Sequence, residues 1–380
     1  MPLDRALLSE KLKKYREQFQ LTIAELSEST GIDEQLLISY ENQEKVPTGD
    51  EILILADFYR CDDYMFFISN EQLTPFERTE TLFRRHGNEF SKEDRWTVQE
   101  FLFLSACESF LSKALLMPLR PTFNFSKSSL MHKTNGIEAV EALRAFLGYS
   151  DRAVPMDIYE DFRSIGIHTF RRALKNSKIS GLYVRHPVAG NCILINYSED
   201  VYRQRFTAAH EAAHAILNDD ENGVLVSFKG QGQDYVEVAA NNFASHYLMP
   251  PAFLRSIPDA SPWNQEKALK WANNLKVSTE ALAYALSNAN LINKETEKTI
   301  KAVRVAKHLK NDPELSGELA PNSLRRKQEL LKKGLSTYYV NLCFEALRRH
   351  IITKARMSEM LLVSHQELYE IAELYNERLQ

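Results

Sequence analysis

The sequence predicts a mostly α-helical α+β protein of three parts: an all-α N-terminal domain, a small central domain with a short β-sheet, and a helical C-terminal region. Three observations carry this prediction. Capped segments of helical period fill residues 1–68, two β-rich segments (GLYVRH and NCILINY) follow one another near residue 190, and helical patterns run almost unbroken from about residue 263. At 380 residues the chain is long enough for more than one sizeable core.

Composition excludes several classes of protein. The net charge of −4 implies no attraction of the whole chain to nucleic acid or to an anionic membrane. Four scattered cysteines without a CxxC pair indicate buried thiols and neither a disulfide framework nor a structural zinc knot. The N-terminus reaches charged residues too early for a secretory signal, and the longest apolar run, FLFLSAC, is too short to span a membrane. We therefore expect a cytoplasmic protein with no membrane partner.

Residues 1–68 are expected to form five short helices of a helix-turn-helix domain. Capping boxes are predicted at Thr22 with Glu25 and at Thr48 with Glu51. Gly31 ends one helix and Asp33 can cap the next, which is the helix-turn-helix pattern.

The rest of the chain divides into three predicted segments: a helical connector and linker (69–125), a central domain (126–260) and a helical C-terminal region (261–380). The linker is LMPLRPTFNFSKSS. The central domain is expected to contain the helices IEAVEALRAFLGY and MDIYEDFRSIG, then a hairpin of the two β-rich segments, and a glycine-punctuated loop after the next helix. The tail ITKARMSEMLLVSHQELYEIAELY resembles a second helix-turn-helix.

The stretch FTAAHEAAHAILNDD (206–220) contains the most informative motif. On a helix, His210 and His214 lie about 40° apart and one turn along the axis, so both imidazoles can reach one ion. Glu211 lies at the flank of that face, where a carboxylate can take a proton from a water without binding the metal. The alternative reading is an ordinary surface helix.

A catalytic zinc needs a third protein ligand, and Glu237 on the next helix is the best choice. Asn241, one turn further on, can accept the second N–H of a ligand histidine. His246 lies nine positions after Glu237 and therefore on the opposite side of that helix, so we exclude it.

The groups that complete such a site are less well defined by the sequence. Tyr235, Arg205 and Tyr247 are candidate donors to a tetrahedral oxyanion, with a structural role as the alternative for each. The strand NCILINY is either an exposed edge that pairs with an extended substrate or an internal strand.

RQRFTAAHEAAHAIL followed by EVAANNFASHYLMPP resembles the ImmA/IrrE family of metallopeptidases, and the upstream strand pair resembles that of the family. The similarity covers roughly residues 135–255, and the N-terminal segment is similar to XRE-type helix-turn-helix domains. The resemblance implies a zincin-like domain with His210, His214 and Glu237 as zinc ligands and Glu211 as general base. It also implies a protein substrate, often a helix-turn-helix repressor. Ala213 and the pair His246-Tyr247 depart from the family pattern without removing a ligand.

The charge of the N-terminal domain argues against the simplest reading of a helix-turn-helix. Residues 1–70 contain seven Lys and Arg against fourteen Asp and Glu, the wrong sign for binding phosphates. Gln35 and Ser39 are the candidate base-reading residues of its second helix. Binding of DNA and binding of a protein partner, including a second copy in a homodimer, stay open as alternatives.

Residues 301–350 have the opposite balance, eleven Lys and Arg against five acids. A solvated helix face is the simpler explanation, and a contact that holds the acidic N-terminal domain is the alternative. For the whole chain we expect a cytoplasmic zinc endopeptidase coupled to a helix-turn-helix module. The alternative is a DNA-binding transcriptional regulator that cleaves nothing and whose peptidase-like domain senses a ligand or metal.

Overall fold

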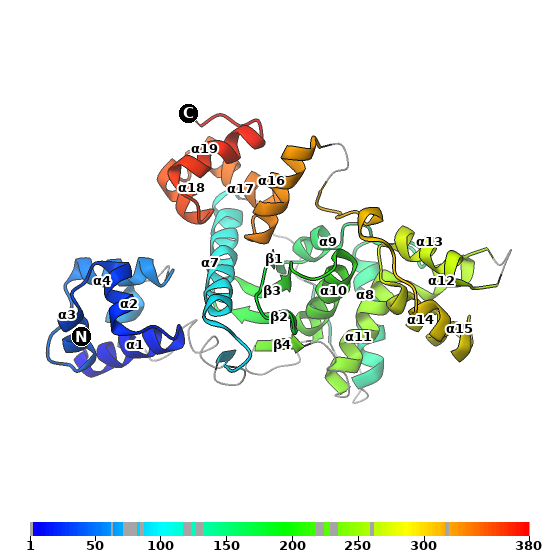
Figure 1. Ribbon diagram of the computed structural model, residues 1–380, viewed down its shortest axis with the longest axis horizontal. Coiled ribbons are helices and arrows are strands. Elements are labelled where there is room, and N and C mark those ends of the chain that lie inside the picture. Colours follow the sequence, from blue (N-terminus) through cyan, green and yellow to red (C-terminus); the bar gives the residue numbers. More distant parts are fainter. Residues whose placement is uncertain are drawn as a thin grey trace.

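The computed structural model of the chain describes residues 3–61, 64–70, 82–83, 87–116, 123–126, 132–217, 224–228, 235–258, 262–315 and 319–379. In this part of the chain the protein is mostly helical with one small sheet, as the sequence predicts. The N-terminal helices lie at one end of the elongated molecule and the sheet lies near its middle (Figure 1). No helix among the described residues is long and apolar enough to cross a membrane.

The N-terminal domain has the predicted helix-turn-helix. Its helices are α1 (Arg5–Gln18), α2 (Ile23–Thr30), α3 (Glu34–Glu41), α4 (Gly49–Phe58) and α5 (Met65–Ile68). Both predicted capping boxes form, at the starts of α2 and α4. Gly31 ends α2 with a φ of 73°, a conformation that glycine adopts without strain, and the Asp33 side chain caps α3.

Helix α7 (Lys92–Ala114) connects this domain to the rest of the chain and also holds it in place. The indole of Trp96 stacks on Phe19 with ring centroids 4.2 Å apart, and Arg95 donates to the carbonyl of Gln18 at 2.6 Å. Lys92 pairs with Glu25 at the start of α2. The N-terminal domain is thus anchored to α7 by stacking and by charged groups.

The sheet has four strands in the order β1-β3-β2-β4. They are β1 (His168–Arg172), β2 (Ile179–His186), β3 (Gly190–Asn196) and β4 (Val224–Phe228). The predicted hairpin is β2 with β3, while β1 runs parallel to β3 and β4 runs antiparallel to β2.

The structure decides between the two alternatives for NCILINY and corrects one expectation about the sheet. The segment contains β3, which lies between β1 and β2, so it is the internal strand and has no exposed edge. The segment after residue 217 was expected to be a glycine-punctuated loop, but it contains β4 (VLVSF), which pairs with β2. Gly223, Gly230 and Gly232 themselves lie outside the described residues.

Helices cover both faces of the sheet. Ile193 and Ile195 of β3 point into a core shared with α8 (His132–Phe146), α9 (Ile158–Ser164), α10 (Val201–Leu217) and α11 (Tyr235–Leu248). Cys192 and Leu194, which alternate with them, point into a second core on the opposite face. Helix α7 belongs to this second core, so it forms a structural layer of the sheet domain as well as a connector.

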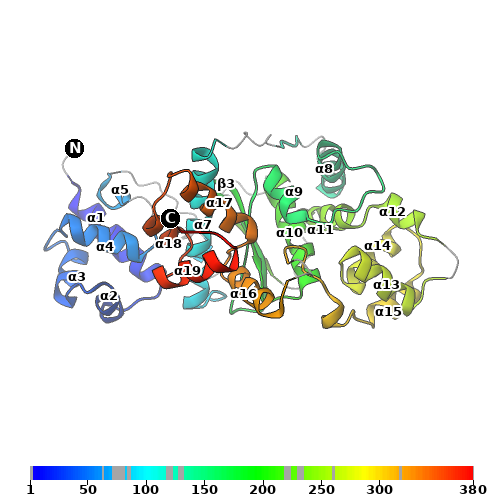
Figure 2. The ribbon, with the colours of Figure 1, turned by 90° about the horizontal axis from the view of Figure 1, so that it is seen from above.

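The C-terminal helices are divided between the two cores. Helices α12 (Pro251–Ser256), α13 (Gln265–Leu275), α14 (Thr279–Asn288) and α15 (Lys294–Lys301) extend the core that contains α10 and α11. After the short 3-10 helix η1 (Lys307–Leu309) come α16 (Pro321–Lys332), α17 (Thr337–Arg348), α18 (Lys354–Met360) and α19 (His365–Leu374). The last three helices pack with α7 on the opposite face (Figure 2).

The segment that leads from the helices of the first core to those of the second is held in place by a buried ion network. Arg171 of β1 binds Asp312 with two hydrogen bonds, at 2.8 and 2.9 Å, and Glu314 at 2.7 Å. Arg163 pairs with the same Glu314 at 2.9 Å. Of the predicted linker only residues 123–126 and Leu116 are described, and the predicted domain boundaries stay predictions.

Candidate metal centre

Helix α10 presents both motif histidines from a buried position. Its alanines at 208, 209, 212 and 213 are fully buried, because small side chains let the helix lie close under the sheet. His210 and His214 are 6% and 0% exposed, and their Nε2 atoms lie 3.1 Å apart. The four-residue spacing therefore converges two imidazole nitrogens on one point.

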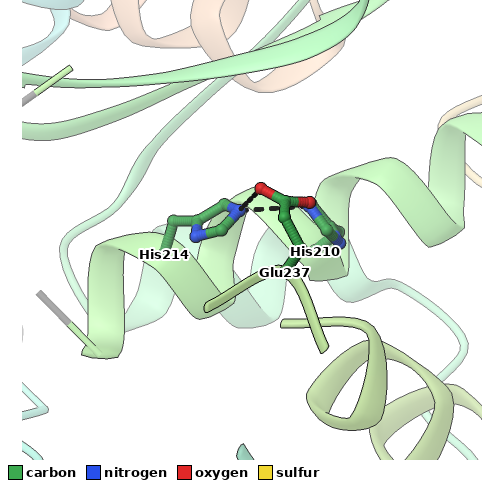
Figure 3. A group of neighbouring side chains, drawn as sticks. All are labelled: His210, His214 and Glu237. Carbon is green, nitrogen blue, oxygen red and sulfur yellow. Dashed lines mark hydrogen bonds and ion pairs between the residues drawn. The ribbon is translucent and has the colours of Figure 1, made fainter. Parts of the chain in front are cut away.

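Glu237 reaches the same point from α11. Its carboxylate oxygens lie 3.2 Å from His210 Nε2 and 3.5 Å from His214 Nε2 (Figure 3). One ligand atom from each of the three residues lies within 4.8 Å of the others. Helices α8 and α11 pack closely at Gly136, since a β-carbon there would come 2.2 Å from the carbonyl oxygen of Ala239. This close packing helps to position α11, which carries Glu237.

Asn241 orients one of the histidines. Its Oδ1 lies 3.1 Å from His210 Nδ1. An amide oxygen only accepts, so Nδ1 carries the proton and the lone pair of His210 is on Nε2, which faces Glu237. Asn241, one helical turn after Glu237, thus holds His210 in orientation, as its spacing from Glu237 predicts.

Glu211 lies next to the histidines and is fully buried under the sheet. Its carboxylate oxygens have no close hydrogen-bond partner in the described part of the chain, although the Ser227 hydroxyl of β4 is near enough to lower the pKa of Glu211 in part. Gly181 of β2 makes room for it, since a β-carbon there would come 2.8 Å from Glu211 Oε1. Burial raises the pKa of Glu211, while His210 and His214 lower it in part.

The donor set fits a divalent transition metal. Two neutral imidazoles and one carboxylate are ligands that zinc prefers, and three protein ligands leave room for further coordination. Burial by itself would raise the pKa of Glu237, but the two histidines outweigh burial and lower it. Three ligand atoms that converge on one point, one of them from an anion, make a suitable place for a cation, and the buried oxygens of Glu211 lie beside it.

The candidate oxyanion donors have other partners or positions. Arg205 is fully buried and donates to the carbonyls of Pro155 and Met156, and the Tyr247 hydroxyl donates to Asp161. Tyr235 is 61% exposed at the start of α11. His246, which the spacing excludes as a ligand, donates to the carbonyl of Asn242. These contacts favour a structural role for Arg205 and Tyr247.

The candidate base-reading residues lie on α3. Gln35 and its neighbour Glu34 are exposed, while the Ser39 hydroxyl donates to the carbonyl of Gln35 at 2.7 Å. Ile38, on the same outer stripe, is also exposed. The surface of α3 thus offers one amide, one carboxylate and one apolar side chain.

Two positions that shape the metal centre were missed in the sequence. Gly181 and Gly136 matter because another element approaches each of them closely. A glycine inside a β-rich segment (SGLYV) and one inside a helical segment (NGIEAV) are the available signals, since glycine in such places often marks a close approach.

The fold and the site together define a metallopeptidase-like domain joined to a helix-turn-helix domain. Residues 162–287 match the family model described as the IrrE N-terminal-like domain, and residues 12–64 match the model described as helix-turn-helix. The chain thus carries an IrrE-like domain behind an N-terminal helix-turn-helix domain.

A curated relative agrees with this assignment. The chain is 33% identical over 102 residues to the radiation response metalloprotease IrrE of Deinococcus radiodurans. The match spans 26% of this chain and 31% of that relative, so it covers less than a third of either protein. No solved structure matches the chain.

Proposed function

We propose that this protein is a zinc-dependent endopeptidase that acts in gene regulation by cleaving a repressor-like protein. The observation that carries the proposal is the convergence of His210, His214 and Glu237 with Glu211 beside them. A helix-turn-helix domain anchored on α7 supports the link to regulation.

Each residue has a distinct part in this proposal. His210, His214 and Glu237 would hold the zinc, and Asn241 keeps His210 in the tautomer that binds through Nε2. Zinc, when bound, polarises the scissile carbonyl and makes a water more acidic. Glu211 takes a proton from the attacking water and returns it to the leaving amine. Its raised pKa suits a base that must also give the proton back.

The similar protein of Deinococcus radiodurans is a radiation response metalloprotease, which supports proteolysis as the chemistry. A repressor as the substrate rests on family resemblance and on the fusion to a helix-turn-helix domain. The acidic charge of the N-terminal domain is compatible with recognition of a basic protein, such as a DNA-binding repressor, by that domain.

The substitution Glu211→Gln tests the proposal. It keeps the size of the side chain and all three ligands, so zinc content should equal that of the unchanged protein while cleavage is lost. New protein N-termini should be compared between cells that carry the unchanged protein and cells that carry Glu211→Gln. Glu266→Gln, at an exposed position of α13, is the matched control and should leave every new N-terminus in place.

The proposal would be overturned if gene regulation by the protein is unchanged in Glu211→Gln and if no new protein N-terminus depends on Glu211. That result would favour the alternative, a regulator whose peptidase-like domain binds a ligand or metal and cleaves nothing.

A further inference from the structure

The last three helices of the chain repeat the architecture of the first three. The two sets are α1–α3 and α17–α19. In each set the first helix is followed, after its C-cap, by a residue in the left-handed conformation, Gln20 or His350. The second helix of each set begins at a threonine N-cap. That helix ends in a second left-handed residue, Gly31 in one set and Leu362 in the other, with φ of 73° and 53°. A third helix then starts from an Asp or Ser cap.

The sequences of the two units agree at a constant spacing along the chain. Five residues of the N-terminal unit recur in the C-terminal one, namely Thr22, Ala24, Ser27, Glu28 and Gln35 as Thr353, Ala355, Ser358, Glu359 and Gln366. At that spacing Leu26 and Leu37 correspond to Met357 and Leu368, and all four are buried. Helices α18 and α19 are therefore a second helix-turn-helix, outside the segment that matches the helix-turn-helix family model.

The second helix of each helix-turn-helix motif, α3 or α19, exposes side chains at the same positions. Ile38 of α3 and Tyr369 of α19 correspond, and they are 37% and 51% exposed. Gln366 and His365 are exposed at the start of α19, as Gln35 and Glu34 are on α3. Figure 2, which looks down on α19, shows no other element over it. The helix that would enter a major groove is therefore accessible in the C-terminal unit.

The two units differ in charge at the positions that would face DNA phosphates. Arg348 and Arg349 end α17, and Lys354 opens α18, next to the N-terminal end of the first helix of the motif. The corresponding end of α1 carries Glu17 and Gln18, and α2 opens with Ile23. Over the whole of each unit the charges are similar, with four Lys and Arg against five Glu in residues 337–374 and five against seven acidic residues in residues 5–41. The difference in charge is therefore local to this flank.

Two of the three acidic residues of α19 already have partners. Glu367 caps its own helix and pairs with Lys333, and Glu370 pairs with Arg326 at 2.9 Å, while Glu373 is exposed near the C-terminal end of the helix. The side chains of Arg348 and Arg349 are more than half exposed, and their ion pairs with Glu345 are surface pairs of little strength. Arg348 also lies 3.9 Å from Glu377, and Arg349 also donates to the carbonyl of Leu115 at 3.3 Å. Both arginines are available to exchange a glutamate for a phosphate.

From the repeated architecture, the exposed side chains of α19 and the basic flank, we propose that the C-terminal unit α17–α19 binds double-stranded DNA. Helix α19 lies in the major groove, with Gln366 reading a base edge, since glutamine can bond to adenine through two hydrogen bonds. Arg348, Arg349 and Lys354 contact phosphates at the start of α18. This activity is separate from the proposed proteolysis and from the acidic N-terminal unit.

The test measures binding of a fluorescein-labelled duplex pool of random sequence to the full chain across a salt series. The triple variant Arg348→Ala/Arg349→Ala/Lys354→Ala should bind at least about ten-fold more weakly at low salt. Its log affinity should depend less steeply on log salt, by about 0.9 for each phosphate contact removed. The matched control, Lys13→Ala/Lys14→Ala on the exposed side of α1, should change neither quantity.

A second pair of variants separates base reading from charge. On duplexes selected from the random pool by the unchanged protein, Gln366→Ala should lose preference by roughly five-fold or more, and Gln35→Ala should retain it. Unchanged thermal unfolding would show that each variant is folded. The proposal fails if the unchanged protein shows no salt-sensitive binding of DNA. It also fails if the triple variant binds DNA as tightly as the unchanged protein, or if the α1 control loses as much affinity as the triple variant. Transfer of the loss to Gln35→Ala would assign DNA binding to the N-terminal unit instead.

Discussion

Glu211 of α10 lies in the space that a side chain at Gly181 of β2 would need. A β-carbon at position 181 would lie 2.8 Å from Glu211 Oε1, 2.7 Å from Thr207 Cγ2 and 2.9 Å from the carbonyl oxygen of Leu194. Thr207 and Glu211 are one helical turn apart, and Leu194 belongs to the neighbouring strand. The space for Glu211, the proposed general base, is therefore set by the absence of a side chain on the sheet.

The substitution Gly181→Ala tests this relationship. The added methyl group meets a backbone oxygen that cannot move freely, so we expect a loss of about 1–3 kcal/mol in the free energy of unfolding. Glu211 should be displaced while the three ligands are untouched, so cleavage should fall and zinc content should not. Gly49→Ala is the control, because nothing lies within 4 Å of a β-carbon there. Equal activity in both variants would show that position 181 does not set the place of Glu211.

Asn241→Ala should weaken zinc binding without abolishing it. The amide fixes the tautomer of His210, and loss of such a partner typically reduces metal affinity about 10–100-fold. Competition with a chromophoric chelator would measure the change, with Asn288→Ala at an exposed position of α14 as control. Zinc affinity equal to that of the control would show that Asn241 does not contribute to zinc binding.

The buried ion network predicts a strong effect of Glu314→Gln. The change leaves the buried guanidiniums of Arg163 and Arg171 without one of their anions, which should cost about 3–5 kcal/mol. Chemical denaturation at neutral pH measures this loss. Glu295→Gln, at an exposed position of α15, should be neutral within about 0.5 kcal/mol.

The same network gives a pH dependence of stability. Burial would raise the pKa of Glu314, but Arg163 and Arg171 outweigh burial and lower it. The contribution of Glu314 is therefore complete above its unfolded pKa of about 4.3 and is lost as pH falls through the lowered folded value. The difference in unfolding free energy between the unchanged protein and Glu314→Gln should shrink as pH falls below about 4. A difference that is constant with pH would contradict this account.

Trp96→Ala should loosen the N-terminal domain from α7. The stack of Trp96 on Phe19 is the aromatic part of the anchor, and its loss should cost about 2 kcal/mol. Hydrogen exchange of α1–α4 should become faster while exchange in β1–β3 is unchanged. Uniform acceleration through the whole chain would indicate general destabilisation instead of release of the domain.

The local parts of this structure were predictable from the sequence. Capping boxes at Thr22 and Thr48 and the His210–His214 pair depend on residues a few positions apart, so a short segment specifies them. Glu237 and Asn241 were predicted in the same way, from one turn of one helix.

The non-local parts could not be predicted in this way. The pairing of β1 with β3 passes over β2, and the pairing of β4 with β2 passes over β3 and α10; strand patterns alone do not specify such partners. The roles of Gly181 and Gly136 depend on which elements approach them in the fold. Helix α7 was expected to be a connector, although its run FLFLSAC, apolar on nearly every side, is typical of a helix buried in a core.

Metal content tests the central claim most directly. The purified protein, after saturation with zinc and removal of excess metal, should retain a single zinc ion per chain by elemental analysis. His210→Ala, His214→Ala and Glu237→Ala should each lose it, and His246→Ala should keep it. A protein that retains no zinc, or one whose zinc survives all three substitutions, would contradict the account.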